Sequence, residues 1–417
     1  MLRSPPATSA AASPRASGSA ALVILAGVCA AVHVGKLPPA ITALQQALGM
    51  SLLQAGFLLS MIQLAGMSSG VAFGALADGL GLRRSMILGL VVLGLASALG
   101  GLATSVPALL VLRAVEGFGF LLVVLPAPGL LRQLVPMQRL SRVLGWWGAY
   151  MPVATAGALL IGPLWIASFG WRAWWWLLAA LSLSMACALA RAVPAAAVVV
   201  RPAAGATLRW STRLRQTLSA PAPWWLALSF AVYSAQWLAV IGFLPAVYAQ
   251  AGVAEGAMAM LTALIAGVNM IGNIGSGRLL HGGVPATRLL VTGFAVMGLA
   301  TVGAFAGVAG EGLPPALRYV ALLAFSMVGG LIPGTLFALA VRAAPGEHLL
   351  STTVGWMQQW SAFGQFVGPP LVAWVTSRVG GWQWTWLVTG GCALIGLALT
   401  WLIRTWLREQ AALQPRP

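Results

Sequence analysis

The stretch Gly74-Ala75-Leu76-Ala77-Asp78-Gly79-Leu80-Gly81-Leu82-Arg83-Arg84 joins two long apolar runs, 51–77 and 85–104. It contains the only aspartate of the chain, and it ends in a pair of arginines. A helix needs roughly 20 apolar residues to cross the hydrocarbon core of a bilayer, which is about 30 Å thick. Both flanking runs are long enough, so the stretch is predicted to be a loop at the membrane surface between two spanning helices.

The composition agrees with a chain that is mostly embedded in lipid. Hydrophobic residues make up 60% of the 417 residues and charged residues only 7%, and the mean hydropathy is +0.91. Soluble proteins carry roughly 25% charged residues. The net charge of +17 comes from arginines scattered between apolar runs, a pattern that favours orientation in a membrane over nucleic-acid binding. Three isolated cysteines offer no metal or redox spacing, and no metal site is expected.

Twelve apolar runs are predicted to span the membrane, and a long polar segment divides them into two groups of six. The expected organisation is a flexible cytoplasmic tail at 1–19, a six-helix bundle at 20–191, a central cytoplasmic loop at 192–221, a second bundle at 222–406 and a tail at 407–417. The spans are placed at 20–45, 51–77, 85–104, 107–131, 143–168, 173–191, 222–249, 257–279, 288–309, 315–341, 350–377 and 382–406. The sequence thus predicts an all-α membrane protein of two pseudo-symmetric six-helix bundles.

The arginines predict the orientation of these spans. With the N-terminus inside, only Arg172, Arg318 and Arg378 fall on the outer side, and the other arginines of the loops and tails fall on the inner side. Cytoplasmic loops carry an excess of basic residues in membrane proteins. Both termini are therefore expected in the cytoplasm of a bacterial cell, with the chain in the inner membrane.

The two groups of six spans share a local pattern. Ile161-Gly162-Pro163 precedes the turn at Gly170-Trp171, and Val367-Gly368-Pro369 precedes the turn at Gly381-Trp382. Tryptophan prefers the membrane interface, which explains the aromatic residues alone. The matching Gly-Pro pairs indicate an internal repeat.

Six plus six spans with a basic central segment resemble the major facilitator superfamily of secondary transporters. The stretch 74–84 is similar to the signature loop of that family, G-x-L-A-D-R-x-G-R-R. The resemblance implies a cytoplasmic gate formed by Gly74, Asp78, Gly81, Arg83 and Arg84. Two positions where arginine is usual carry glycine and leucine instead, at 79 and 82, so a thinner charge network is expected.

Two further elements carry the resemblance. Arg113-Ala114-Val115-Glu116-Gly117-Phe118-Gly119 in the fourth span is similar to the family's R-x-x-x-G-x-G element, which implies a role for Arg113 in proton coupling or in binding substrate charge. Gly35-Lys36-Leu37-Pro38-Pro39 and 147–152 resemble the cyanate-permease and nitroimidazole-transporter branch.

Ionisable side chains inside spans are the candidates for substrate and proton binding, since each costs roughly 2.5–3.5 kcal/mol on insertion scales. His33 and Lys36 share one helix face in the first span. Lys36 either binds an anion or extends to the outer headgroups, and His33 is either a proton-sensitive group or a packing residue. Arg113 and Glu116, three residues apart, form either a site or an intrahelical pair. Uncharged candidates are Tyr150, Tyr233, Gln236 and Asn269.

The sequence therefore favours a secondary transporter that works by alternating access. Lys36 and Arg113 would give its cavity a surplus positive charge that a single acid, Glu116, cannot neutralise, which favours a small anion moved with a proton. An exporter of drugs by proton antiport is the alternative, and a channel or membrane sensor is the alternative from another class. No catalytic motif, cofactor or nucleic-acid partner is indicated, and the expected partners are lipid, a small solute and protons, around a monomer.

Overall fold

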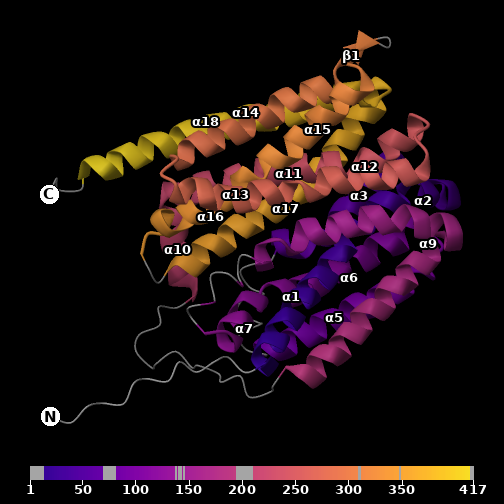
Figure 1. Ribbon diagram of the computed structural model, residues 1–417, viewed down its shortest axis with the longest axis horizontal. Helices are drawn as coiled ribbons and strands as arrows, with labels where there is room; N and C mark the ends of the chain where they lie inside the picture. The colour runs from indigo at the N-terminus through magenta and orange to yellow at the C-terminus, as the bar shows by residue number, and fades with distance from the viewer. Residues whose placement is uncertain are drawn as a thin grey trace.

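The computed structural model describes residues 14–68, 81–136, 139, 143, 146–193, 210–308, 311–346 and 349–413. These residues form long, roughly aligned helices in two groups. In Figure 1 the N-terminal group lies below the C-terminal group. The described chain begins at Pro14 and ends at Leu413, both at the left end of the bundle in Figure 1. We call this the terminal end and the opposite end the distal end.

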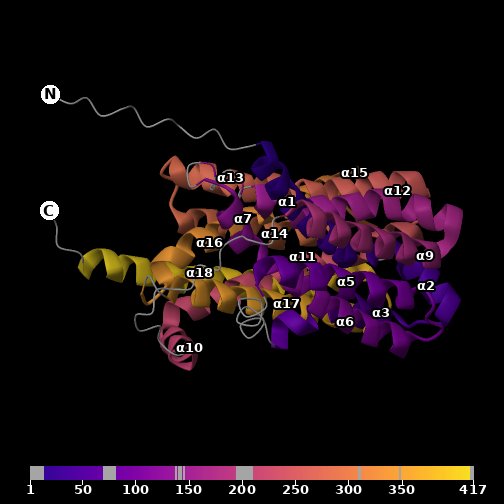
Figure 2. The same cartoon turned by 90° about the horizontal axis from the view of Figure 1, so that it is seen from below.

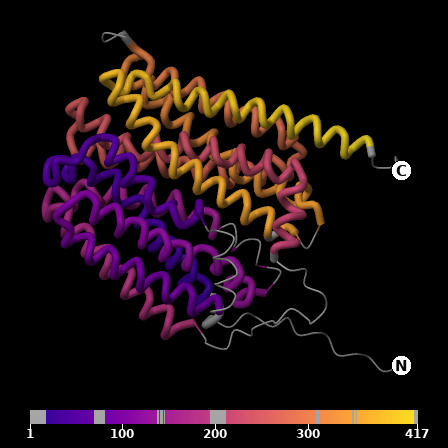
Figure 3. Tube along the Cα trace, turned by 180° about the vertical axis from the view of Figure 1, so that it is seen from behind, coloured from indigo at the N-terminus to yellow at the C-terminus, as the bar shows by residue number. Residues whose placement is uncertain are grey.

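The first group of helices belongs to the N-terminal half. Its elements are α1 (Pro14–Gly35), η1 (Pro38–Ala40), α2 (Ile41–Leu48), α3 (Leu52–Ser60), η2 (Met61–Gln63), α5 (Leu82–Gly100), α6 (Val106–Val124), α7 (Ala127–Leu134) and α9 (Tyr150–Ala192). They are the indigo to magenta elements of Figure 3.

The second group belongs to the C-terminal half. Its elements are α10 (Trp210–Ser219), α11 (Pro221–Gln250), α12 (Glu255–Gly267), α13 (Asn269–His281), α14 (Ala286–Phe305), β1 (Gly307–Val308), β2 (Glu311–Gly312), α15 (Pro315–Gly329), α16 (Leu331–Ala343), α17 (Leu350–Val379), η4 (Trp382–Trp384) and α18 (Thr385–Leu413). The strands form one two-residue antiparallel pair. The predicted all-α class is confirmed, with this pair as a small addition.

Nine helices of the described part of the chain are long and apolar enough to cross a membrane. One of them, α9, has 43 residues and contains two predicted spans, which meet at Gly170 with φ 81° and ψ 164°. Leu52–Ser68 is a shorter apolar helix, and α17 has 30 residues but several glutamines that lower its hydropathy. Each of the twelve predicted spans therefore has a helical counterpart.

Three segments predicted as tails or loop are partly helical. Helix α1 starts at Pro14, a residue whose fixed φ suits the first helical position, and the Ser19 hydroxyl donates to the Ala192 carbonyl at 3.1 Å. Helix α10 lies within the predicted central loop, of which residues 194–209 are outside the described residues. Helix α18 runs to Leu413, since Leu, Arg, Glu, Gln and Ala all favour helix.

Local sequence determines the helix boundaries at the distal end of the N-terminal half. Pro38 and Pro39 lack the backbone donors that would continue α1. Gly49, with φ 62°, ends α2 in the left-handed region, where glycine is favoured. Ser51 and Gln54 form a capping box that starts α3. The chain therefore turns back sharply, and Lys36 directly follows the last residue of α1.

The two halves meet along two pairs of helices, α3 with α17 and α9 with α12. At the distal end they share one apolar core. We call its central part the distal layer, which contains side chains of α2, α3, α11 and α17: Ile41, Leu44, Ala55, Leu58, Phe243, Val372 and Ala373. The other two cores each belong almost entirely to one half. The halves are therefore joined by apolar packing at the distal end; Figure 2 gives the perpendicular view.

Candidate functional site

Four ionisable side chains from two helices converge inside the N-terminal half. His33 and Lys36 come from the end of α1, and Arg113 and Glu116 come from the middle of α6. His33 and Lys36 are 0% exposed, and Arg113 and Glu116 are 1% exposed. We call these four residues the charge cluster.

Glu116 lies between the two cations of the charge cluster. Its Oε1 accepts a hydrogen bond from the Lys36 Nζ, and its Oε2 accepts one from the Arg113 Nη1 at 2.6 Å. The Arg113 contact is the intrahelical pair that a spacing of three residues permits. Each oxygen of one carboxylate thus serves a different cation.

Further contacts hold the Lys36 side chain. Its Nζ donates to the Ser97 Oγ at 3.1 Å, and that hydroxyl donates to the Trp175 carbonyl at 2.9 Å. The Nζ also lies 4.7 Å from the centre of a Trp175 ring, within the range of a cation–π contact. The Trp174 indole donates to the Lys36 carbonyl at 3.1 Å. Lys36 is enclosed by α5, α6 and α9, and the interpretation that it extends to the headgroups is wrong.

Arg113 binds the backbone of two neighbouring helices. Its Nη1 donates to the His33 carbonyl at 2.7 Å, and its Nε donates to the Leu58 carbonyl at 3.3 Å. Its Nη2 is buried and has no hydrogen-bond partner among the described residues. Leaving a buried donor without a partner costs free energy, and a ligand that accepts a hydrogen bond from it would remove this cost.

His33 connects the charge cluster to α9. Its Nε2 lies 2.7 Å from the Ser182 Oγ, so one of these two atoms donates to the other. Its Nδ1 is 3.8 Å from the Glu116 Oε1, too far for a hydrogen bond, and no described atom binds it. A small movement of either side chain would bring them into contact.

The charge cluster has more positive than negative charge. Two cations and one carboxylate leave a net charge of +1 when His33 is neutral. With exposures of 0–1%, water does not compensate this charge. The two cations do not face an open cavity in this state, in contrast to the expectation from the sequence. They bind Glu116 instead, because an unpaired cation is costly in a low-dielectric interior.

The uncharged candidates lie elsewhere. Tyr150 stacks on Trp147, with ring centres 4.5 Å apart, at the terminal end of α9. Tyr233 and Asn269 bind each other across α11 and α13, with the Asn269 Nδ2 donating to the Tyr233 hydroxyl at 3.1 Å. Gln236 is 1% exposed, and neither of its amide atoms has a partner among the described residues.

The predicted gate stretch is described only in part. Gly74 and Asp78 lie outside the described residues. Gly81 has φ 85° and starts α5, a backbone conformation that suits glycine. Arg83 donates to the Ala190 carbonyl and so links α5 to the end of α9, whereas Arg84 is exposed.

Sequence reasoning missed three residues that contact the side chains of the charge cluster: Ser97, Trp175 and Ser182. Their signal was weak, because serine is common in membrane helices and tryptophan was interpreted as an interface residue. A polar link also joins the two halves. The Gln63 Nε2 donates to the Gln365 Oε1 at 2.9 Å, and the Gln365 Nε2 donates to the Ser361 Oγ at 3.3 Å.

Comparisons with known proteins identify the fold and the family. Residues 23–369 match the profile described as the Major Facilitator Superfamily. No curated protein matches the chain. Two crystal structures of a bacterial homologue of the human lysosomal transporter Spinster are similar, both inward-facing. The unoccupied one has a TM-score of 0.72 and the occupied one 0.74, each at 16% identity over 95% of this chain and 99% of that chain. The chain belongs to the major facilitator superfamily and is a multi-pass membrane protein of this family of transporters.

Proposed function

We propose that this transporter moves a small anion together with a proton, and that Lys36 and Arg113 bind the anion. The observation that carries the proposal is the net positive charge of the charge cluster at 0–1% exposure. A buried charge without a counter-ion costs several kcal/mol in proteins. An anion that enters the cluster lowers its positive charge, and the unpaired Arg113 Nη2 supplies a donor for it.

Glu116 is the proposed proton carrier. While it is ionised, its two oxygens occupy Lys36 and Arg113, so a substrate anion competes with it for the same cations. A proton on Glu116 removes this competition and releases both cations. Groups that face Glu116 are His33 and Lys36 from α1 and Arg113 from its own helix. Anion and proton then bind together.

Proton symport also removes the electrical work of moving an anion into the cell. A negative interior opposes an entering anion by about 2.3 kcal/mol per charge for each 100 mV. A proton that crosses with a monovalent anion cancels this charge. Accumulation of the anion then depends on the pH difference across the membrane.

The proposed transport cycle is alternating access. The distal layer closes the path between the halves at one end. The halves have largely separate cores away from this layer, which allows them to separate at the terminal end. Access from the distal side then requires the distal layer to open and the halves to meet at the terminal end.

The test is uptake by the purified protein in liposomes, with cyanate, nitrate, nitrite, formate and acetate as substrates. At least one anion is expected to accumulate when the side of addition is more acidic. Lys36→Gln and Arg113→Gln are each expected to lower kcat/KM by about tenfold to a hundredfold, the value of one hydrogen bond to a charged group. Arg288→Gln is the matched control, because Arg288 is exposed at the start of α14.

Three results would contradict the proposal. If both variants retain wild-type anion uptake and its pH dependence, Lys36 and Arg113 do not bind the anion. If the protein moves only lipophilic cations against a proton gradient, it is a drug exporter. Flux that never saturates would identify a channel.

A further inference from the structure

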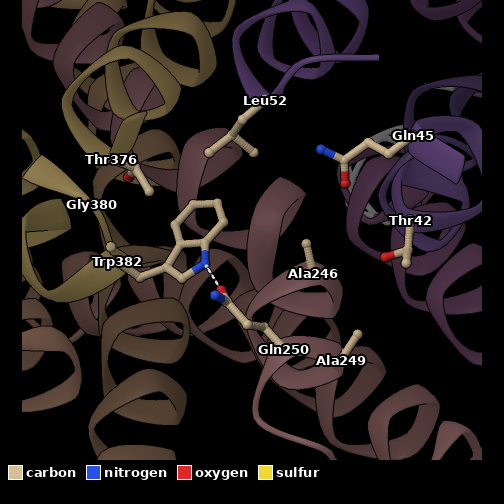
Figure 4. Close-up of a pocket in the computed structure, with 10 residues that line it drawn as sticks. Thr42, Gln45, Leu52, Ala246, Ala249, Gln250, Thr376, Gly380 and Trp382 are labelled. Atoms are coloured by element: carbon tan, nitrogen blue, oxygen red, sulfur yellow. Dashed lines mark hydrogen bonds between the residues drawn. The ribbon is translucent and has the colours of Figure 1, made fainter. Parts of the chain in front are cut away.

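A pocket of about 470 Å³ opens at the distal end of the molecule, between the two halves. Figure 4 shows the side chains around it. One wall comes from α2 and the start of α3, and the other comes from α11, α17 and η4. The lining residues are Thr42, Gln45, Leu52, Ala246, Ala249, Gln250, Thr376, Gly380, Gly381 and Trp382.

The distal layer lies directly below this pocket. Three lining residues of the pocket are each three positions along the chain, or about one helical turn, from a residue of the distal layer. The pairs are Leu52 with Ala55, Ala246 with Phe243, and Thr376 with Ala373. The pocket therefore exists because the halves are closed at this end. When the distal layer opens, its two walls move apart and the pocket is lost.

The lining of the pocket combines polar and apolar side chains and carries no charge. The Trp382 Nε1 donates to the Gln250 Oε1 at 2.8 Å, and Figure 4 shows no hydrogen bond from the Gln250 amide nitrogen to another of the lining residues drawn. Gln45 and Thr42 supply further donors and acceptors from the opposite wall.

Trp382 adds an aromatic surface to these polar groups. Its ring centre is 5.2 Å from that of Phe243 in the distal layer, and its side chain is half-buried. A flat molecule can pack against the part of the indole that remains exposed. Without a charged residue in the lining, an ion would lose its water without gaining a counter-charge.

We propose that this distal pocket is a second binding site, for a small, flat, uncharged molecule with a carboxamide-like group, and that its ligand inhibits the transporter. The ligand touches both halves, so it binds the distal-closed state and stabilises it against opening. A ligand shifts a two-state equilibrium by its difference in affinity for the two states. The site is separate from the charge cluster, and it does not depend on which solute the protein carries.

The first test measures binding of benzamide to the full-length protein in lipid nanodiscs by calorimetry. Benzoate and benzylammonium are the charged counterparts of the same shape. Benzamide is expected to bind at least about tenfold more tightly than either ion. Trp382→Ala and Gln250→Ala are each expected to weaken benzamide about tenfold, the value of one aromatic or hydrogen-bonded contact. Trp384→Ala is the matched control, because Trp384 does not line the pocket.

The second test measures opening of the distal layer. Ala55→Cys, in a chain whose three natural cysteines are replaced by alanine, is labelled with a membrane-impermeant maleimide from the distal side. Benzamide at ten times its dissociation constant is expected to slow labelling about tenfold. Trp382→Ala should abolish this effect at the same concentration. The proposal is overturned if benzamide does not bind, or if it binds equally tightly to the Trp382→Ala variant. It is also overturned if benzoate or benzylammonium binds as tightly as benzamide, or if benzamide leaves the labelling rate unchanged.

Discussion

At the residue scale, Glu116 is the group on which the charge cluster depends. Lys36 and Arg113 are both inside the N-terminal half, and both use this one carboxylate as a counter-charge. Removal of one cation leaves a balanced pair, whereas removal of the carboxylate leaves two cations without a partner. The two kinds of substitution therefore differ in their cost to folding.

We predict that Glu116→Gln destabilises the protein far more than Lys36→Met. Loss of one partner of a buried ion pair costs about 3–5 kcal/mol when it leaves an uncompensated charge. Lys36→Met keeps the aliphatic part of the side chain and the Arg113–Glu116 pair, so a cost of about 1 kcal/mol is expected. Thermal unfolding in detergent measures both. Equal or reversed unfolding temperatures would show that Glu116 is not the shared counter-charge.

At the element scale, close packing of α17 on α11 depends on glycine. A Cβ added to Gly364 would lie 2.0 Å from the Ala231 carbonyl oxygen, and one added to Gly368 would lie 2.3 Å from the Ala235 carbonyl oxygen. The obstructing atoms are backbone, which cannot move aside as a flexible side chain would. The two helices would have to separate.

We predict that Gly364→Ala and Gly368→Ala each lower the free energy of unfolding by about 1–3 kcal/mol, the cost of overpacking a core. Gly390→Ala and Gly391→Ala in α18 are the controls, because a Cβ there meets nothing within 4 Å. These two should leave stability unchanged or raise it by about 0.5–1 kcal/mol. Similar unfolding temperatures for all four variants would contradict the close approach of α17 and α11.

The predicted gate stretch at 74–84 belongs to the same scale. Asp78 lies outside the described residues, and its role follows from the family resemblance of the stretch that contains it. We predict that Asp78→Asn reduces transport in liposomes while the amount of folded protein in the membrane stays the same, because the substitution removes a charge but no apolar packing. Wild-type transport in this variant would show that the loop no longer acts as a gate.

At the scale of the whole molecule, both described ends of the chain lie at one end of the bundle (Figure 1). With the ends of the chain on this side, the order of the spans predicts that the arginines of the loops and tails lie here too, apart from Arg172, Arg318 and Arg378. We propose that the terminal end faces the cytoplasm, because basic loops remain there during membrane insertion. The charge cluster would then lie beneath the distal layer, toward the outer face.

We predict that a green fluorescent protein fused after Pro417 is fluorescent and that alkaline phosphatase fused at the same place is inactive. The first reporter folds in the cytoplasm, and the second is active only in the periplasm. Fusions in the turn after α9's first span, near Gly170, should give the opposite result. Phosphatase activity at the C-terminus would reverse the proposed orientation.

Much of the fold was accessible from the sequence, since lipid imposes a simple rule on it. A spanning helix must satisfy its backbone internally and present apolar side chains, so each span appears as a long apolar run. The predicted helix boundaries were wrong where this rule does not apply. Both α1 and α18 extend beyond the hydrophobic runs into segments predicted as tails, and at the end of α18 local propensity continues the helix.

The candidate site was accessible only in part. Charged residues in spans are rare, so His33, Lys36, Arg113 and Glu116 could be selected by composition alone. Their spacing placed each pair on one face of its helix. That α1 and α6 bring the two pairs together, and that Ser97, Trp175 and Ser182 complete the surroundings, depends on contacts between residues up to 149 positions apart.

The sequence by itself determined the twelve spans, the family and the choice of ionisable residues, because hydrophobicity and local motifs are properties of short segments. Only the tertiary structure decided that Glu116 serves both cations, that Lys36 is enclosed and that the halves close over a common distal layer. These features depend on which helix faces lie opposite each other. Many pairings of apolar helices have nearly the same free energy in lipid, and close packing between small residues selects among them.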